Sequence, residues 1–155
     1  MKVEYLDPFV QGADLVLKEF SVGGVKTGGL GLLGTTFPTA SINITTRVDG
    51  SLRGDVVYSM SSVTARKLAG LITGMETHTF GRRMGEGLSQ FGNILAEQTG
   101  KLLEERGLEC EFSSPTIFQG LNVEFSATAP ALAVPIDTDV GRVEVSVAVD
   151  YGEPS

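Results

Sequence analysis

The sequence has little cysteine, histidine and positive charge, and each shortage excludes a class of chemistry. Its 155 residues contain one cysteine, Cys110, which cannot form an internal disulfide. The neighbouring carboxylates of Glu109 and Glu111 are expected to raise the pKa of the thiol and lower its reactivity, so we expect a buried strand residue. The single histidine, His78, has no histidine, cysteine or carboxylate pair at ligand spacing, which predicts a surface loop residue and no metal site.

Positive charge is scarce and scattered. The chain has 12 Lys and Arg against 19 Asp and Glu, a formal net charge of -7. The only tight basic pair is Arg82-Arg83, whereas proteins that bind phosphate backbones cluster their basic residues. The composition therefore excludes nucleic acid as the expected partner and favours a protein or a small molecule.

Long apolar runs are also missing. No segment approaches the roughly 18 to 20 apolar residues that cross a membrane. The opening residues carry acids, at Glu4 and Asp7, where a signal peptide has an apolar run. We therefore expect no membrane association and a cytoplasmic location, with a single domain over 1–155 large enough to fold around one core.

Two shorter helices are predicted from their ends. Asp7-Pro8 favours a helix start with Asp7 as the N-cap, and the helix over 8–20 places Phe9, Ala13, Val16 and Phe20 on one face. Ser61 or Ser62 is expected to cap a second helix that runs through Ile72 and stops at Gly74.

A third helix, from Met84 to Arg106 with Gly107 as its end, carries two stripes. The apolar stripe is expected to face the core and comprises Met84, Leu88, Phe91, Leu95 and Leu102. The polar stripe follows steps of four, three and four residues and comprises Glu86, Gln90, Asn93 and Glu97. Since a helix rises about 1.5 Å per residue, Gln90 and Asn93 lie roughly 4.5 Å apart along the axis and can contact one target. The alternative is an ordinary solvated helix face.

The other segments read as strands. Residues 40–48 alternate, Asp49-Gly50 has hairpin-turn chemistry, and 54–60 forms the returning strand. Later strand-like segments cover 108–112, 116–119, 122–126, 131–136 and 142–149. This order favours an α+β domain with a largely antiparallel sheet and helices on one face.

The glycine-rich segment 23–34 is interpreted as a flexible linker or turn region. Within it, residues 29–34 match the dinucleotide pattern G-x-G-x-x-G. A phosphate site needs such glycines to follow a strand and open a helix, whereas these follow a helix and open a strand. Lys26-Thr27 likewise lacks the following helix of a phosphate-binding loop, so nucleotide binding is not expected.

With the elements in order, the chain resembles the CheX family, phosphatases that act on the phosphorylated chemotaxis response regulator CheY. The resemblance covers nearly the whole length and depends on the order and spacing of several segments. These are MKVEYLDPFV (1–10), DGSLRGDVV (49–57), SSVTARKLA (61–69), NIL (93–95), SPTIFQG (114–120) and VPIDTDVG (134–141).

The resemblance implies a site on the long helix. The family motif has an acidic or seryl residue, a glutamate four residues on and an asparagine three further, and matches Glu86, Gln90 and Asn93 here. The asparagine is retained and the glutamate is replaced. In the family, the asparagine amide holds a water in line with the receiver's aspartyl phosphate, and the glutamate pairs with the receiver's lysine. The Mg²⁺ belongs to the receiver, so this chain is expected to bind no metal or cofactor itself.

The residue types suit those roles unequally. A carboxamide at Asn93 can accept a hydrogen bond from a water, which orients the water, and can donate hydrogen bonds to phosphoryl oxygens without repelling them. Gln90 can reach the lysine through its carbonyl. Because this acceptor carries no charge, the binding free energy is expected to be weaker than with the family's glutamate by about 1 to 2 kcal/mol. Glu86 or Glu97 would supply the missing carboxylate if the partner shifts along the helix, and both are expected to contact it.

Two functions remain open. The first is a phosphatase for a CheY-like receiver, with Asn93 and Gln90 as its catalytic residues. The second is a module of the same fold that binds a receiver or a flagellar switch component without catalysis. A ligand-binding domain unrelated to receivers is a third, weaker alternative. The family also pairs through its sheets, and the β-branched strand 143–149 would need covered edges, so a homodimer is predicted. Strand propensity alone does not separate such pairing between subunits from pairing within the chain.

Overall fold

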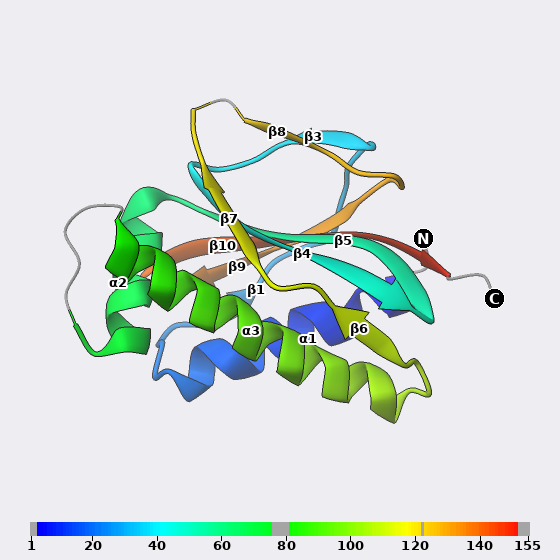
Figure 1. Ribbon diagram of the computed structural model, residues 1–155, viewed down its shortest axis with the longest axis horizontal. Helices are drawn as coiled ribbons and strands as arrows, with labels where there is room; N and C mark the ends of the chain where they lie inside the picture. The colour runs from blue at the N-terminus through cyan, green and yellow to red at the C-terminus, as the bar shows by residue number, and fades with distance from the viewer. Residues whose placement is uncertain (1–2, 76–80, 122, 152–155) are drawn as a thin grey trace.

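The computed structural model describes residues 3–75, 81–121 and 123–151 and shows an α+β fold (Figure 1), as predicted. The helical elements are η1 (Val3–Tyr5), α1 (Asp7–Glu19), α2 (Ser62–Thr73) and α3 (Arg82–Glu105). The strands are β1 (Lys26–Thr27), β2 (Gly31–Leu32), β3 (Thr36–Pro38), β4 (Ile42–Gly50), β5 (Leu52–Met60), β6 (Cys110–Phe112), β7 (Thr116–Gln119), β8 (Glu124–Ser126), β9 (Leu132–Thr138) and β10 (Gly141–Tyr151).

The strands form one large antiparallel sheet and a small ladder. The main path is β1-β9-β10-β5-β4-β6, with β2 also pairing with β9 and β7 also pairing with β4. Helices α1 and α3 lie side by side below this sheet, α2 lies at its end, and the β3-β8 ladder lies above it (Figure 1). The structure thus confirms the predicted arrangement of helices and antiparallel strands.

Strand alternation divides the interior into two clusters. Alternate residues of β10, from Val143 to Val149, are buried against the helices because strand side chains change face at each residue. Between them, Ala148 faces the other way and packs with Phe37 of the β3-β8 ladder. Each face of the central strands is therefore covered by a different layer.

The central position of β10 removes one argument for a dimer. Strand β10 pairs with β5 on one side and with β9 on the other, over almost its whole length. Its strand edges are satisfied inside the fold, so pairing within the chain is the alternative that the structure supports for 143–149, and these edges give no reason for a dimer. The pattern of β-branched residues reflects a strand that is buried on both faces.

The β4-β5 hairpin contains two glycines with positive φ. The predicted hairpin is confirmed, but Asp49 and Gly50 still belong to β4, and the returning strand begins at Leu52, two residues earlier than predicted. Gly50 has φ 122°, and its N–H donates to Asp49 Oδ1 at 3.0 Å. Further along, Gly54 has φ 151°, and a Cβ there would lie 1.9 Å from the carbonyl oxygen of Ala148 on β10. Only glycine fits this close approach of β5 and β10.

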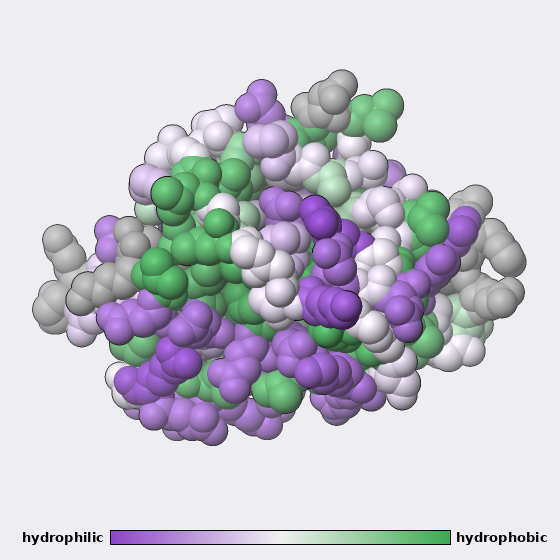
Figure 2. All heavy atoms as spheres, turned by 180° about the vertical axis from the view of Figure 1, so that it is seen from behind, coloured by the Kyte–Doolittle hydropathy of each residue, from purple (hydrophilic) through white to green (hydrophobic). Residues whose placement is uncertain are grey.

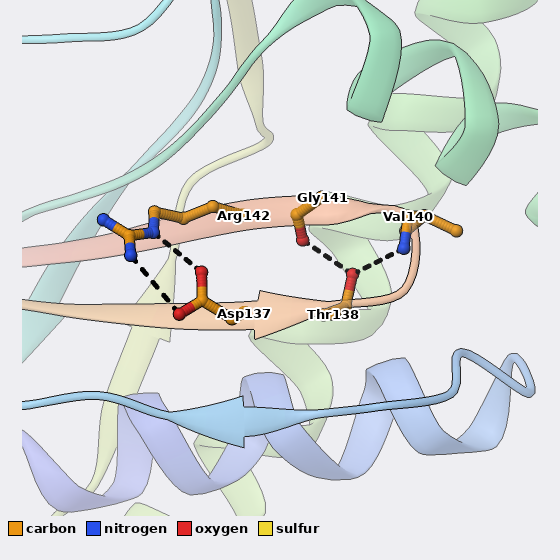
Figure 3. Close-up of polar contacts among 5 residues, drawn as sticks. All are labelled: Asp137, Thr138, Val140, Gly141 and Arg142. Atoms are coloured by element: carbon orange, nitrogen blue, oxygen red, sulfur yellow. Dashed lines mark hydrogen bonds and ion pairs between the residues drawn. The ribbon is translucent and has the colours of Figure 1, made fainter.

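The β9-β10 hairpin is closed by its own side chains (Figure 3). The Thr138 hydroxyl donates to the carbonyl of Gly141 at 2.7 Å and accepts from the N–H of Val140 at 3.1 Å. Next to the turn, Arg142 Nε lies 2.8 Å from Asp137 Oδ1, and this hydrogen bond holds the pKa of the exposed Asp137 carboxyl below its usual value. Side chains of this one segment thus specify the turn.

The predicted helix ends are confirmed for α2 and corrected for α1. Ser61 is the N-cap of α2 and accepts from the N–H of Thr64 at 3.2 Å, and Gly74 ends the helix with φ 71°. Helix α1 has Leu6 at its N-cap position without a side-chain hydrogen bond, so Asp7 is its first residue and not the N-cap. The N–H of Leu6 donates to the carbonyl of Val3 in the preceding turn η1, and Asp7 still lies favourably at the positive end of the helix dipole.

One of the four residues predicted for the core face of α1 was wrong. Phe9, Ala13 and Val16 are buried as expected, but Phe20 is only partly buried. Leu17 is fully buried in its place, because the helix ends at Glu19 and the chain turns away after it.

The glycine-rich segment 23–34 belongs to the sheet. Lys26 and Thr27 pair with Asp137 and Ile136, and Gly31 and Leu32 pair with Ala133 and Leu132. Its interpretation as a flexible linker was therefore wrong for these residues, because β1 and β2 pair with β9 and form the edge of the sheet next to it.

Cys110 lies on the strand β6, as predicted, but it is only half buried, whereas a buried residue was expected. Burial is the main cause that raises the pKa of its thiol, and the carboxylate of Asp49 raises the pKa further. The predicted direction is confirmed, but the charge that contributes lies on the paired strand β4 and not on Glu109 or Glu111. Two other predicted positions, His78 and the strand start at Asn122, lie outside the described residues.

The face opposite to that of Figure 1 is mixed in polarity. Figure 2 shows hydrophilic side chains across its lower part and a hydrophobic patch above them on the left. Exposed apolar side chains include Leu30 and Leu32, in the segment that borders β9. Among the described residues, no helix has both the length and the apolar character needed to cross a bilayer.

Candidate functional site

Helix α3 forms the candidate site and spans Arg82–Glu105, within two residues of the predicted ends. It closes at Gly107, which has φ 77°; the N–H groups of Gly107 and Leu108 donate to the carbonyls of Glu104 and Leu103. The predicted core residues Met84, Leu88, Phe91 and Leu95 are all buried. Leu102 is only partly buried, however, and Leu103 is buried in its place, so the last predicted core residue was wrong.

Small residues bring α3 close to three neighbouring elements. A Cβ on Gly87 would lie 3.1 Å from the Cβ of Ala69 on α2. A Cβ on Gly92 would lie 2.8 Å from Pro115 Cβ and 3.0 Å from Ile44 Cγ2, which belong to the chain before β7 and to β4. On α1, a Cβ at Gly12 would lie 2.5 Å from the Thr99 hydroxyl of α3. These approaches fix how the outer face of α3 is presented.

The contact at Gly92 gives a first prediction. Gly92→Ala is expected to lower the free energy of unfolding by about 1 kcal/mol or more, because overpacking against Pro115 outweighs the gain in helix propensity. Gly85 of the same helix is the matched control, since in the described structure no atom lies within 4 Å of a Cβ built there. Gly85→Ala is expected to raise stability by up to about 1 kcal/mol. Denaturant unfolding measures both variants, and equal effects would contradict the close packing at Gly92.

The predicted polar stripe lies on the outer face of α3. Glu86, Gln90, Asn93 and Glu97 are all exposed. All four line one shallow depression of about 690 Å³. The other lining residues are Arg82, Gly85, Ser89 and Ile94 of α3 and Ile117 of β7. The structure therefore brings together every site residue predicted from the sequence, and adds a neighbour from another element.

The two acids of the stripe are already paired within the helix. Arg82 Nε lies 3.1 Å from Glu86 Oε1, and Lys101 Nζ lies 3.6 Å from Glu97 Oε1. Between them along the helix, the side-chain amides of Gln90 and Asn93 make no hydrogen bond with any described residue. The middle of the depression thus presents two uncharged amides with their donors and acceptors available, and an ion pair lies towards each end.

This arrangement suits recognition of an external group. An exposed carboxamide can donate and accept at the same time, so it can bridge a water and an anionic oxygen. No group of three or more His, Cys, Asp or Glu side chains within the described ranges could hold a metal ion. The sequence reasoning missed Ile117 and the two ion pairs; of these, only the ion pairs had a sequence signal, the i,i+4 spacing.

Comparisons with known proteins agree with this architecture. No protein-family model matches the chain. A curated relative, the CheY-P phosphatase CheX of Thermotoga maritima, is 27% identical over 90 residues, which make up 57% of this chain and 58% of that protein. The chain thus spans less than two thirds of this relative's length.

Solved structures match over nearly the whole chain. A CheC-like superfamily protein from Shewanella aligns with a TM-score of 0.83 and 15% identity, over 97% of this chain and 99% of that one. CheX of Borrelia burgdorferi, solved in a complex with CheY, BeF3 and Mg²⁺, aligns with a TM-score of 0.74 and 22% identity, over 96% and 99%. The resemblance to CheX is confirmed, and the fold is CheC/CheX-like.

Proposed function

We propose that this chain, with its CheC/CheX-like fold, hydrolyses the aspartyl phosphate of a CheY-like receiver domain. The observation that carries the proposal is Asn93: its amide is exposed, unpaired among the described residues, and central in the depression on α3. A similar protein is named a CheY-P phosphatase, and a protein of the same fold was solved with CheY. Receivers act in the cytoplasm, so we expect this chain to act there.

The proposed mechanism is one of positioning. With α3 docked over the receiver, the Asn93 carbonyl accepts a hydrogen bond from a water and its N–H₂ group donates to a phosphoryl oxygen. The water oxygen attacks phosphorus, the bond from phosphorus to the aspartyl oxygen breaks, and the receiver regains its carboxylate. Both protons of the water stay on the released phosphate, which leaves as H₂PO₄⁻. The Mg²⁺ that neutralises the phosphoryl charge is expected on the receiver, with no metal or cofactor on this chain.

Gln90 is proposed to anchor the receiver through its lysine. Its amide lies one turn before Asn93 on the same exposed face, so both side chains can reach one docked surface. Glu86 and Glu97 flank the two amides and are proposed to contact the partner. Exposed i,i+4 ion pairs contribute only about 0.3 to 0.5 kcal/mol, so Arg82 and Lys101 can release these carboxylates at low cost.

Restoring the acid at position 90 gives a second prediction. Gln90→Glu is expected to tighten binding of the phosphorylated receiver or to raise the rate, by about 10-fold, because a charged acceptor binds a lysine more strongly. Titration of a receiver and single-turnover phosphate release measure the two effects. The control is Glu104→Gln, an exposed position on α3 outside the depression. An unchanged affinity and rate would show that position 90 is not the lysine anchor.

The direct test measures phosphate release from phosphorylated CheY-like receivers of the same organism. Wild-type protein is compared with Asn93→Ala and with receiver alone. If no receiver loses phosphate faster with wild type than with the variant, the phosphatase proposal fails.

A binding module without catalysis is the second candidate, favoured by the glutamine at position 90. In that case the chain would bind a receiver or flagellar switch component and leave the rate of phosphate loss unchanged. The homodimer stays a prediction from the resemblance alone, which sedimentation would measure.

A further inference from the structure

The depression beside Asn93 has a wall that does not belong to α3. Among its lining residues, Ile117 alone comes from another element, the strand β7. Ile117 is partly buried: it packs against the main core and also borders the depression. It therefore presents an apolar surface next to the polar stripe.

The register of β7 explains this orientation. Ile117 pairs with Ile44 of β4, whose side chain is buried in the core on the side of the helices. The next residue, Phe118, points to the opposite face and stacks on Phe125 of β8, with ring centroids 6.5 Å apart. A shift of register by one residue would exchange the two side chains, so the strand pairing itself places Ile117 beside α3.

A receiver docked on α3 needs more surface than the polar stripe offers. Specific protein interfaces bury about 800 Å² on each partner, with an apolar centre and a polar rim. The four polar side chains along α3 can provide the rim, and the large apolar side chains that line the depression are Ile94 of α3 and Ile117 of β7. The ion pairs Arg82–Glu86 and Lys101–Glu97 lie towards the ends of the depression, and Ile117 is a lining residue from the neighbouring wall.

We propose that Ile117 is a docking residue that packs against an apolar side chain of the CheY-like receiver and sets its affinity. This proposal rests on the proposed function. In the proposed mechanism, Ile117 contacts no reacting atom. It holds the receiver against α3, while Asn93 acts on the water. It therefore predicts an effect on binding that is separable from the rate of the chemical step.

The test compares Ile117→Val with Ile117→Thr. The two variants have nearly the same shape and both keep a β-branched side chain, so they share any cost of the lost methyl group in the fold. They differ in apolar character, because threonine places a hydroxyl where valine has a methyl group. Thermal unfolding of both variants identifies a temperature at which each is folded.

Binding is measured with a CheY-like receiver activated by beryllium fluoride, and turnover with the phosphorylated receiver. Ile117→Thr is expected to raise the dissociation constant about 5- to 10-fold over Ile117→Val, the effect of burying a hydroxyl in an apolar contact. The KM should rise in parallel and kcat should stay within about twofold, as expected for a contact made equally before and during the reaction.

Equal dissociation constants for the two variants, or a loss confined to kcat, would overturn the docking role of Ile117. This outcome is distinguishable from failure of the proposed function. If Asn93→Ala slows phosphate release while the Ile117 variants bind alike, only the docking proposal fails. If Asn93→Ala has no effect while Ile117→Thr weakens binding, the chain docks a receiver but does not hydrolyse its phosphate. If wild type binds no receiver, both proposals fail.

Discussion

Replacing Asn93 with alanine is expected to reduce receiver dephosphorylation by about 100-fold or more, since removing one preorganised polar group at a reacting centre typically has this effect. The loss should fall on kcat, because the amide acts on the attacking water and contributes little of the docking surface. The fold should be unaffected, because the Asn93 side chain is exposed and makes no hydrogen bond with a described residue. Single-turnover phosphate release at saturating protein measures this step directly.

Two controls separate positioning from docking. Asn93→Asp keeps the size of the side chain but replaces its N–H₂ donors with a negative charge next to the phosphoryl group, so it is expected to be as slow as Asn93→Ala. Glu104→Ala, on the same helix outside the depression, is expected to keep the wild-type rate. A fully active Asn93→Asp variant would contradict the role assigned to the amide.

Replacing Gly54 with alanine is expected to lower the free energy of unfolding by about 3 kcal/mol or more. Two causes add: the φ of 151° is rare for residues with a side chain, and a Cβ would lie 1.9 Å from the Ala148 carbonyl oxygen. The oxygen belongs to the backbone of β10, so it cannot turn aside without loss of strand pairing. For a domain of this size the melting temperature should fall by about 6 to 12 °C.

Gly29 provides the matched control for this substitution. In the described structure no atom lies within 4 Å of a Cβ built at Gly29, and its φ is not in the left-handed region. Gly29→Ala is therefore expected to leave the melting temperature nearly unchanged or to raise it slightly, because it restricts the unfolded chain. A similar loss of stability at both glycines would contradict the steric explanation for Gly54.

Local signals in the sequence were sufficient for the helices and the long hairpin. Ser61, Gly74 and Gly107 act within a few residues of themselves, so a cap or a stop can be read without knowledge of the fold. The turn at Asp49-Gly50 is equally local. Helix periodicity also placed Gln90 and Asn93 on the exposed face, because the opposite stripe is strongly apolar.

The predictions from the sequence were wrong or incomplete where contacts between segments far apart in the chain determine the structure. The choice of Leu103 over Leu102 reflects a change of neighbour along α3: Gly87 packs on α2, whereas Thr99 packs on α1, so the buried face shifts around the helix. The two-residue strands of the glycine-rich segment have no period to detect, and their pairing is set by β9, about a hundred residues later. Ile117 was missed for the same reason, since strand propensity does not reveal which helix a strand lies beside.

The glycines on the buried face of α3 constrain how the exposed face of this helix can evolve. With Gly87 and Gly92 in tight contact with α2 and with the residues before β7, the helix has no room to slide or rotate, and the spacing between its two outer amides is fixed by the scaffold. A change of partner must then come from substitutions at solvent-facing positions such as 86, 90 and 97, one at a time. A larger residue in place of Gly87 or Gly92 would instead displace all the outward side chains of α3 together. Substitutions at these two positions would therefore affect both the stability of the fold and the recognition of a partner.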